Sequence, residues 1–92
     1  MPRPRSDASV EERLTGYARE NGWTPGTGTH STPRGLYPAA HYSRGTDHIR
    51  VIFYPATGRV YSADLMGETR ASRTSRGLRE IRGWLWKLGD RA

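Results

Sequence analysis

The sequence predicts an α+β domain with two helices packed on one face of a three-stranded antiparallel meander, in the order α-β-β-β-α. Three observations predict this fold. Apolar residues recur at helical spacing near both ends of the chain, polar and apolar residues alternate in the middle, and glycine-containing turns separate the alternating segments. Ninety-two residues suffice for one such domain. We assign residues 9–92 to it and residues 1–8 to a flexible basic arm.

The first helix is predicted over roughly residues 10–20. Ser9 and Glu12 have the spacing of a capping box, in which each side chain satisfies the backbone amide of the other residue. The apolar positions that follow at helical spacing are Val10, Leu14, Tyr17 and Ala18. Gly22 supplies a left-handed residue that ends the helix, and Trp23 then folds back onto its last turn.

Residues 24–35 are rich in glycine, proline and threonine and have no apolar periodicity, so we expect a mobile surface loop there. Three strands are then predicted at 39–44, 48–54 and 59–65. A Gly45-Thr46 turn joins the first two of these strands. Two hairpins therefore build the predicted sheet.

The alternation in the second hairpin specifies its register. A three-residue loop at 56–58, with Gly58 left-handed, pairs Phe53 with Tyr61, Val51 with Ala63 and Ile49 with Leu65. One face then becomes wholly apolar, and Ala40 and Tyr42 from the preceding strand join it. The opposite face carries His41, Ser43, His48, Arg50, Ile52, Tyr54, Val60, Ser62 and Asp64.

The second helix is predicted from about residue 75 to 88. Its apolar stripe consists of Leu78, Ile81, Leu85 and Leu88, with Trp84 on the margin. This stripe should dock on the sheet, because the opposite half of the helix carries Arg76, Arg79 and Arg82. Trp86 projects among these arginines and is therefore expected to be exposed.

Composition narrows the possible functions. Fifteen basic and nine acidic residues give a net charge of +6, and all but one of the basic residues are arginine. Such a balance favours association with nucleic acid or acidic surfaces, although arginine-rich usage also accompanies high-GC genomes. The chain has no cysteine and no apolar stretch after its charged N-terminal residues. We therefore expect a cytoplasmic protein with no disulfide, signal peptide or membrane anchor.

No motif for catalysis is found: the chain has no nucleophile elbow, paired carboxylates or Walker pattern. We therefore expect a protein that is not an enzyme and has no cofactor. His30, His41 and His48 lack the spacing of a zinc motif. His41 and His48 lie diagonally on the open sheet face, which suggests metal ligation. Neighbouring surface histidines usually bind no metal, however, and we expect none.

An arginine occupies every third position from Arg70 to Arg82. Guanidiniums this close repel one another unless an anion neutralises them, and their forked geometry matches phosphate. Arg70 and Arg73 should cluster with Arg76 at the amino end of the second helix, where the helix dipole also favours an anion. Two alternatives remain open: a solvated helix face that maintains solubility, and a cation–π pair between Arg82 and Trp86.

The predicted nucleic-acid-binding residues combine this run with its flanks. They are Arg70, Arg73, Arg76, Arg79, Arg82, Trp86, Lys87, Arg3, Arg5 and Arg50. Arg3 and Arg5, in the N-terminal arm, could follow a groove or be an ordinary frayed terminus. Arg50 faces Asp64 in the predicted register, so a cross-strand ion pair could occupy it instead.

The segments 42–52 and 58–65, the Asn-Gly-Trp sequence at 21–23 and the Trp-Leu-containing last helix resemble those of small uncharacterised proteins of actinobacteriophages and their hosts. The resemblance extends over residues 10–88. It implies a phage or prophage setting in a bacterial cell and no particular activity.

The predicted element order is also similar to that of the double-stranded-RNA-binding domain, whose second helix begins with a basic cluster directed at phosphates. Arg73, Arg76 and Arg79 stand roughly where that cluster falls. The tight Gly45-Thr46 turn departs from the longer loop that enters the minor groove in that family, so the similarity is one of topology.

These observations predict a non-enzymatic module that binds nucleic acid, duplex DNA rather than RNA, mainly through backbone phosphates. A regulatory or architectural role in a phage would suit such a module. The alternative is a phage-encoded interaction module that binds and modulates a host protein, with Trp86 and the open sheet face as anchors.

Overall fold

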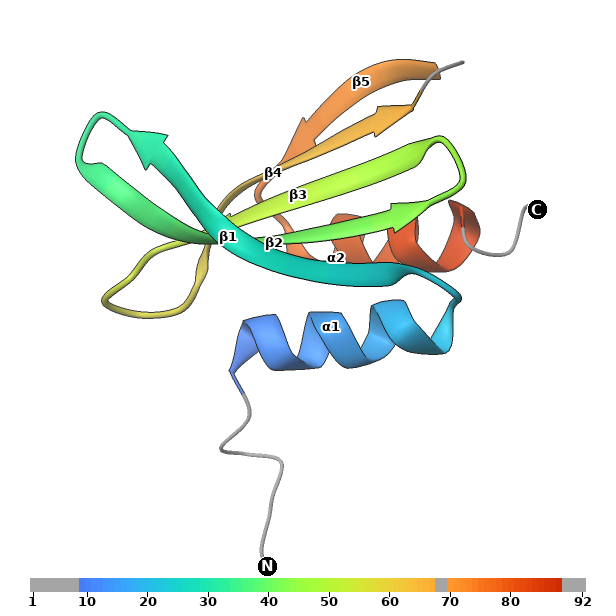
Figure 1. Cartoon of the computed structure of the whole chain (residues 1–92), viewed down its shortest axis with the longest axis horizontal. Coiled ribbons are helices and arrows are strands. Elements are labelled where there is room, and N and C mark those ends of the chain that lie inside the picture. Colours follow the sequence, from blue (N-terminus) through green and yellow to red (C-terminus); the bar gives the residue numbers. More distant parts are fainter. Residues whose placement is uncertain (1–8, 68–69, 89–92) are drawn as a thin grey trace, which may run out of the picture.

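The computed structural model describes residues 9–67 and 70–88, and the side chains of 9–66 and 74–86. A helix, α1 (Val10–Glu20), is followed by five strands, β1 (Thr24–Thr32), β2 (Gly35–Arg44), β3 (Asp47–Phe53), β4 (Val60–Gly67) and β5 (Arg70–Ser75). The chain continues through α2 (Leu78–Gly83) and a π-helical turn, η2 (Trp84–Leu88). The strands form one antiparallel sheet in sequence order (Figure 1). The α+β class is confirmed.

The predicted number of strands is too low, because two polar segments are also strands. β1 occupies most of residues 24–35, predicted to be a loop, and pairs with β2 from Thr24↔Ser43 to Thr32↔Gly35. β5 takes up the first part of the arginine run and pairs with β4. Both lie at sheet edges, where a strand needs little apolar surface. Neither therefore carries the alternation on which the sequence-based assignment depends.

The first helix is capped and ends as predicted. The Ser9 hydroxyl accepts a hydrogen bond from the Glu12 amide at 3.0 Å, and a Glu12 carboxylate oxygen accepts one from the Ser9 amide at 3.0 Å. At the other end of α1, Gly22 has a φ of 84°. The Trp23 amide then donates to the Ala18 carbonyl at 3.0 Å, which turns the indole back toward the helix.

The central hairpins have the predicted register except at one end. Arg44↔Asp47 closes the β2–β3 turn, and Gly45 there has a φ of 59°. In the β3–β4 hairpin, Val51↔Ala63 and Ile49↔Leu65 are confirmed, whereas Phe53 pairs with Val60 and not with Tyr61. An irregularity between Ile52 and Phe53 causes this shift.

The shift by one residue exchanges the faces of two side chains, because neighbouring strand residues point to opposite sides. Val60 packs with Phe53 against the helix-covered core, although it was predicted on the open face. Tyr61 packs with Tyr37, Ala39 and Ile52 in a second cluster on the open face.

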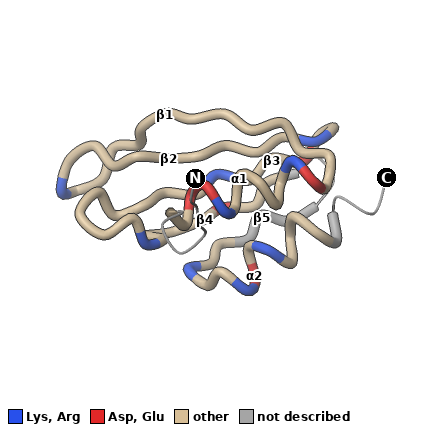
Figure 2. The backbone as a smooth tube through the Cα atoms, turned by 90° about the horizontal axis from the view of Figure 1, so that it is seen from below, with Lys and Arg blue, Asp and Glu red and all other residues tan. Residues whose placement is uncertain are grey.

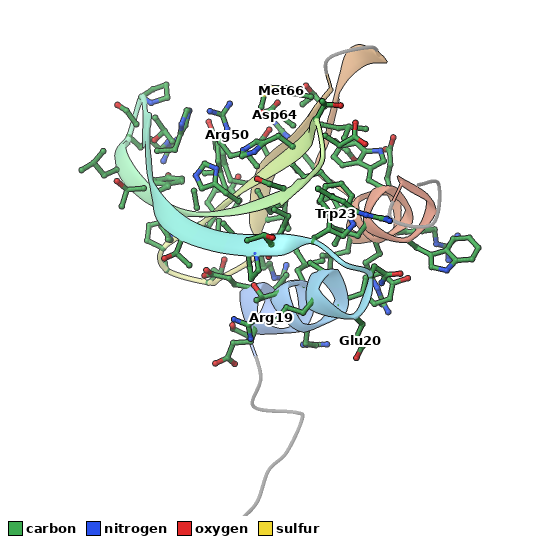
Figure 3. The ribbon with its side chains drawn as sticks, turned by 45° about the vertical axis from the view of Figure 1, so that its right-hand side comes forward. Arg19, Glu20, Trp23, Arg50, Asp64 and Met66 are labelled. Carbon is green, nitrogen blue, oxygen red and sulfur yellow. The ribbon has the colours of Figure 1, made fainter. Side chains whose placement is uncertain are left out.

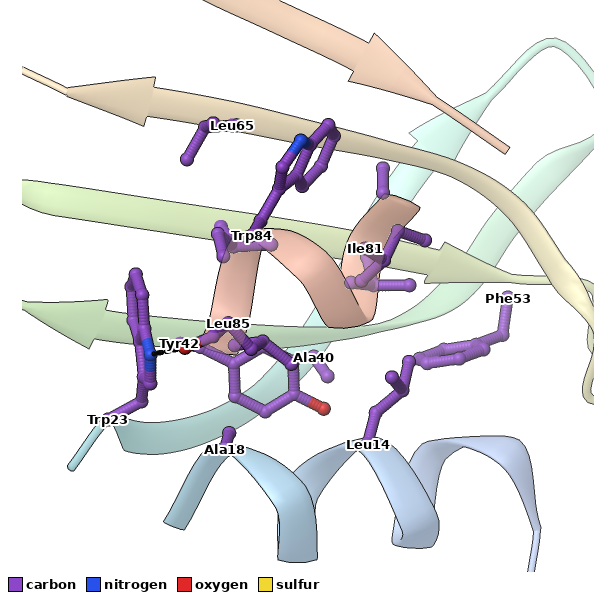
Figure 4. Close-up of a cluster of buried hydrophobic side chains, with 13 residues drawn as sticks. Leu14, Ala18, Trp23, Ala40, Tyr42, Phe53, Leu65, Ile81, Trp84 and Leu85 are labelled. Carbon is purple, nitrogen blue, oxygen red and sulfur yellow. Dashed lines mark hydrogen bonds between the residues drawn. The ribbon is translucent and has the colours of Figure 1, made fainter. Parts of the chain in front are cut away.

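The main core lies between the sheet and the two helices (Figure 4). Ala18 from α1 and Ile81 and Leu85 from α2 and η2 are fully buried there. The Trp23 indole donates to the Leu85 carbonyl at 2.9 Å, which ties the end of α1 to η2. Burying an aliphatic side chain of this size contributes about 1.5–3 kcal/mol, so this interface holds the helices to the sheet.

The second helix departs from its predicted extent and packing. It begins at Leu78, not near residue 75, because Ser75 still belongs to β5 and Gly77 occupies the N-cap. Leu78 therefore lies in the first turn with 41 % of its surface exposed, although it was predicted to be buried. Trp84, predicted on the margin, is buried (5 % exposed). The side chain of Leu88 lies outside those described.

Candidate nucleic-acid interface

The arginine run is divided among three parts of the fold. Arg70 and Arg73 belong to β5, Arg76 lies in the connection after it, and Arg79 and Arg82 belong to α2. The backbone places Arg70 and Arg73 on an edge strand, and because their side chains lie outside those described, their expected cluster with Arg76 at the helix start stays a prediction. A strand rises about 3.3 Å per residue and carries these positions away along the sheet edge.

Three guanidiniums remain at the α2 end of the molecule. Arg76, Arg79 and Arg82 are exposed, and Figure 2 shows basic positions on and beside α2 as well as along α1 and at the ends of the sheet. Within the part of the chain that the structure describes, none of the three forms an ion pair. Contact of these guanidiniums with an external anion would therefore displace no ion pair among the described residues.

Trp86 is exposed as predicted, with 52 % of its surface accessible. It belongs to η2, immediately after the buried Leu85. The guanidinium of Arg82 lies over the Tyr17 ring, at 5.1 Å from its centroid. This cation–π contact links α2 to α1, where the sequence had suggested a contact with Trp86 instead.

A shallow hollow of about 360 Å³ lies where α1 approaches α2. Its lining residues are Tyr17, Leu78, Arg79, Arg82, Gly83 and Trp86. A second groove extends from Leu78 and Arg82 along α1 past Val10 and Arg13. This surface thus combines the guanidinium groups of arginines with the exposed side chains of Trp86 and Leu78. Leu78 was missed as a surface residue because it matches the apolar spacing of a buried helix stripe, whereas Tyr17 is partly buried against the core and also lines the hollow.

Arg50 is placed differently from the other predicted binding residues. Its guanidinium Nη2 donates to Asp64 Oδ2 at 2.8 Å, and Asp64 Oδ1 accepts from the Thr74 hydroxyl at 3.2 Å. Figure 3 shows Arg50 and Asp64 on the face of the sheet away from the helices. The expected cross-strand ion pair is confirmed, and it neutralises the charge that Arg50 would offer a phosphate.

The remaining predicted residues are not placed in detail. Arg3 and Arg5 lie outside the described residues, as do the side chains of Arg70, Arg73 and Lys87. Among the described residues, the candidate interface therefore consists of Arg76, Arg79, Arg82 and Trp86, together with Tyr17 and Leu78.

The open sheet face carries a histidine network in addition to the Arg50–Asp64 pair. His41 Nδ1 lies 3.2 Å from His48 Nε2, and the Ser43 hydroxyl lies 3.2 Å from His48 Nδ1. Burial lowers the pKa of His41 below its ordinary value of 6.5, and the nearby charges of His48, Arg50 and His30 act in the same direction. Among the described residues, no group of three or more His, Cys, Asp or Glu side chains converges on one point.

Three tyrosines also form an aromatic cluster on this face. The Tyr37 and Tyr61 ring centroids are 5.2 Å apart and those of Tyr54 and Tyr61 are 5.3 Å apart, both edge to face. The sequence did not reveal this cluster, because Tyr37 was assigned to no element and Tyr61 to the opposite face.

No known family model, curated protein or solved structure matches this chain. Among the described residues, no helix has the length and apolar character needed to cross a membrane.

Proposed function

We propose that this protein is a non-enzymatic nucleic-acid-binding module that contacts duplex DNA through its backbone phosphates. The observation that carries the proposal is the exposure of Arg76, Arg79 and Arg82 beside Trp86, with no carboxylate paired to these arginines in the described part of the chain. Arginine forks bind phosphate oxygens, and an exposed indole can pack on a sugar or a base. The sequence resemblance suggests a phage or prophage setting, in which a regulatory or architectural role would suit such a module.

The test is a mobility-shift titration on duplex DNA, duplex RNA and single strands at two ionic strengths. Binding to phosphates should weaken steeply with salt, and each lost contact should lower the log–log slope by about 0.9 for duplex DNA. An Arg76→Gln/Arg79→Gln variant should bind more weakly and with a shallower slope. Arg82 is left intact in this variant because it also covers Tyr17.

The matched control is Arg34→Gln/Arg59→Gln, which removes the same charge from two exposed positions outside β5 and α2. It should bind more tightly than the Arg76/Arg79 variant and keep a slope closer to that of the wild type. Equal losses of DNA affinity in the two variants would show that binding depends on the net charge of the protein and not on the position of these arginines. Unaltered DNA binding by the Arg76/Arg79 variant would exclude α2 as the contact.

A host-protein-binding module is the second candidate, and the exposed apolar surface of Leu78 and Trp86 favours it. Trp and Arg are over-represented among residues that dominate protein interfaces. Trp86→Ala should then abolish capture of one specific protein, and nuclease treatment should make no difference. Loss of that protein after nuclease treatment would instead indicate a bridging nucleic acid.

A further inference from the structure

On the open sheet face, the ring nitrogens of His41 and His48 lie within hydrogen-bond distance of each other. In the β2–β3 pairing, His41 lies opposite Arg50 and Ser43 lies opposite His48, so the two imidazoles are diagonal neighbours on one face. Both are half-buried, and His41 Nδ1 and His48 Nε2 approach to 3.2 Å. The backbone at both positions is held by the β2–β3 hydrogen bonds, so the close approach of the two nitrogens does not depend on a flexible loop.

The protonation states available to this pair suit a metal ligand. When His48 Nδ1–H donates to the Ser43 hydroxyl at 3.2 Å, His48 Nε2 accepts a hydrogen bond from His41 Nδ1–H at 3.2 Å, so a metal ion would replace that shared proton and leave His41 protonated at Nε2. A neutral imidazole is the form that binds metal, and its second nitrogen is commonly held by a hydrogen bond of this kind.

The distance between the facing nitrogens also fits a shared cation. Two imidazole nitrogens, each about 2.0–2.1 Å from a tetrahedral zinc ion, lie about 3.3–3.4 Å apart. The observed 3.2 Å separation of His41 Nδ1 and His48 Nε2 is close to that value. Modest rotation of the two rings, which are tilted by 47° to each other, would aim both lone pairs at one ion.

We propose that His41 and His48 form a two-histidine binding site for a divalent transition-metal ion, with Ser43 orienting His48 and water completing the coordination. Imidazole ligands suit Zn²⁺ and Cu²⁺, and Cu²⁺ should bind more tightly. The site bridges β2 and β3 and is separate from the arginine surface on α2.

The surroundings limit the affinity of this site for a cation. The positive charge of Arg50 would repel a bound cation, but the Asp64 carboxylate, 2.8 Å from the guanidinium, partly neutralises it. With two protein ligands, binding should be weaker than at structural zinc sites with three or four.

The experiment uses the full chain, first treated with a chelator and then titrated calorimetrically with Cu²⁺ and with Zn²⁺. We expect one ion per chain, with Cu²⁺ the tighter. His41→Gln and His48→Gln should each weaken binding at least tenfold, whereas the control His30→Gln should stay within about twofold. Ser43→Ala should lower affinity by a smaller factor, because it removes only the group that orients His48.

A second measurement needs no variant. Cu²⁺ added to the wild-type protein should give an electron paramagnetic resonance spectrum with coupling to two imidazole nitrogens, and should broaden the amide signals of 41 and 48 first. Wild-type affinity in both histidine variants, or broadening centred elsewhere, would overturn the site. Absence of stoichiometric binding at millimolar metal would overturn it too. None of these results depends on DNA binding, which the Arg76→Gln/Arg79→Gln variant tests separately.

Discussion

The two faces of the sheet are built from the same strands but by different chemistry. On the helix-covered face, β3 contributes Ile49 and Val51 to a core that α1 and α2 close. On the open face, the same strand contributes His48, Arg50 and Ile52 to a histidine network, an ion pair and an aromatic cluster. One strand therefore serves both a dry interior and a polar surface, through the alternation of its side chains.

The difference between the faces separates what specifies the fold from what is available for function. Apolar contacts on the helix-covered face join elements distant in sequence, such as Trp23 and Leu85. The polar contacts on the open face, His41–His48 and Arg50–Asp64, link strands that the backbone ladder already pairs. Substitutions there should change local chemistry more than they change stability.

The sharpest test compares two isoleucines on β3. Ile49 is fully buried beneath the helices, and Ile52 is 3 % exposed beneath the tyrosines of the open face. Truncation of a buried isoleucine to alanine costs about 2–5 kcal/mol, depending on how far the surroundings can collapse. We expect Ile49→Ala near the upper end and Ile52→Ala near the lower end, measured by urea denaturation. The tyrosine rings border solvent and can move into the space left at Ile52.

Equal losses of unfolding free energy for the two substitutions would show that the two faces of the sheet contribute alike to stability. Leu36→Ala, at a side chain with 68 % of its surface exposed, is the control for the loss of an aliphatic group and should change stability little.

An intermediate effect is expected at the Arg50–Asp64 pair. The two side chains are 29 % and 25 % exposed, and Arg50 Nε is buried without a hydrogen-bond partner. Asp64→Asn leaves the guanidinium without its counter-charge and should cost about 1 kcal/mol, reduced from the value of a buried pair by solvent screening. A double-mutant cycle with Arg50→Gln measures the coupling. Coupling near zero would show that the ion pair does not stabilise the open face.

The elements that could be predicted from the sequence are those with a local chemical signal. The Ser9–Glu12 capping box, the Gly45-Thr46 turn and the pairing of Val51 with Ala63 each depend on residues near one another in the chain. β1 and β5 were missed because edge strands can be polar on both faces. Their identity depends on a pairing partner, which the pattern within the strand does not reveal.

The candidate interface was predictable to the extent that it lies on one helical segment. The exposure of Arg79 and Trp86 follows from helical periodicity and is found in the structure. The contribution of Tyr17 is a tertiary feature, since α1 meets Arg82 only after both helices dock on the sheet. The placement of Arg70 and Arg73 on β5 also required the sheet to be known.

The smallest expected effect is a dependence of stability on pH, which should arise from the open face and not from the helix-covered core. The pKa of His41 is lowered in the folded state, first by burial and then by His48, Arg50 and His30. Below its ordinary pKa of 6.5, the unfolded chain therefore binds this proton more readily than the folded chain does. The stability of chelator-treated protein should fall as the pH drops from 7.5 toward 5.

His41→Gln removes this proton uptake and should flatten the fall in stability, measured by urea denaturation at each pH. His30→Gln is the matched control: it removes one histidine but leaves His41 desolvated, so most of the dependence on pH should persist. A wild-type slope in the His41 variant would assign the acid sensitivity to other groups. The helix-covered core has no buried charged residue among those described. A slope that His41→Gln abolishes would therefore locate the acid response on the open face of the sheet.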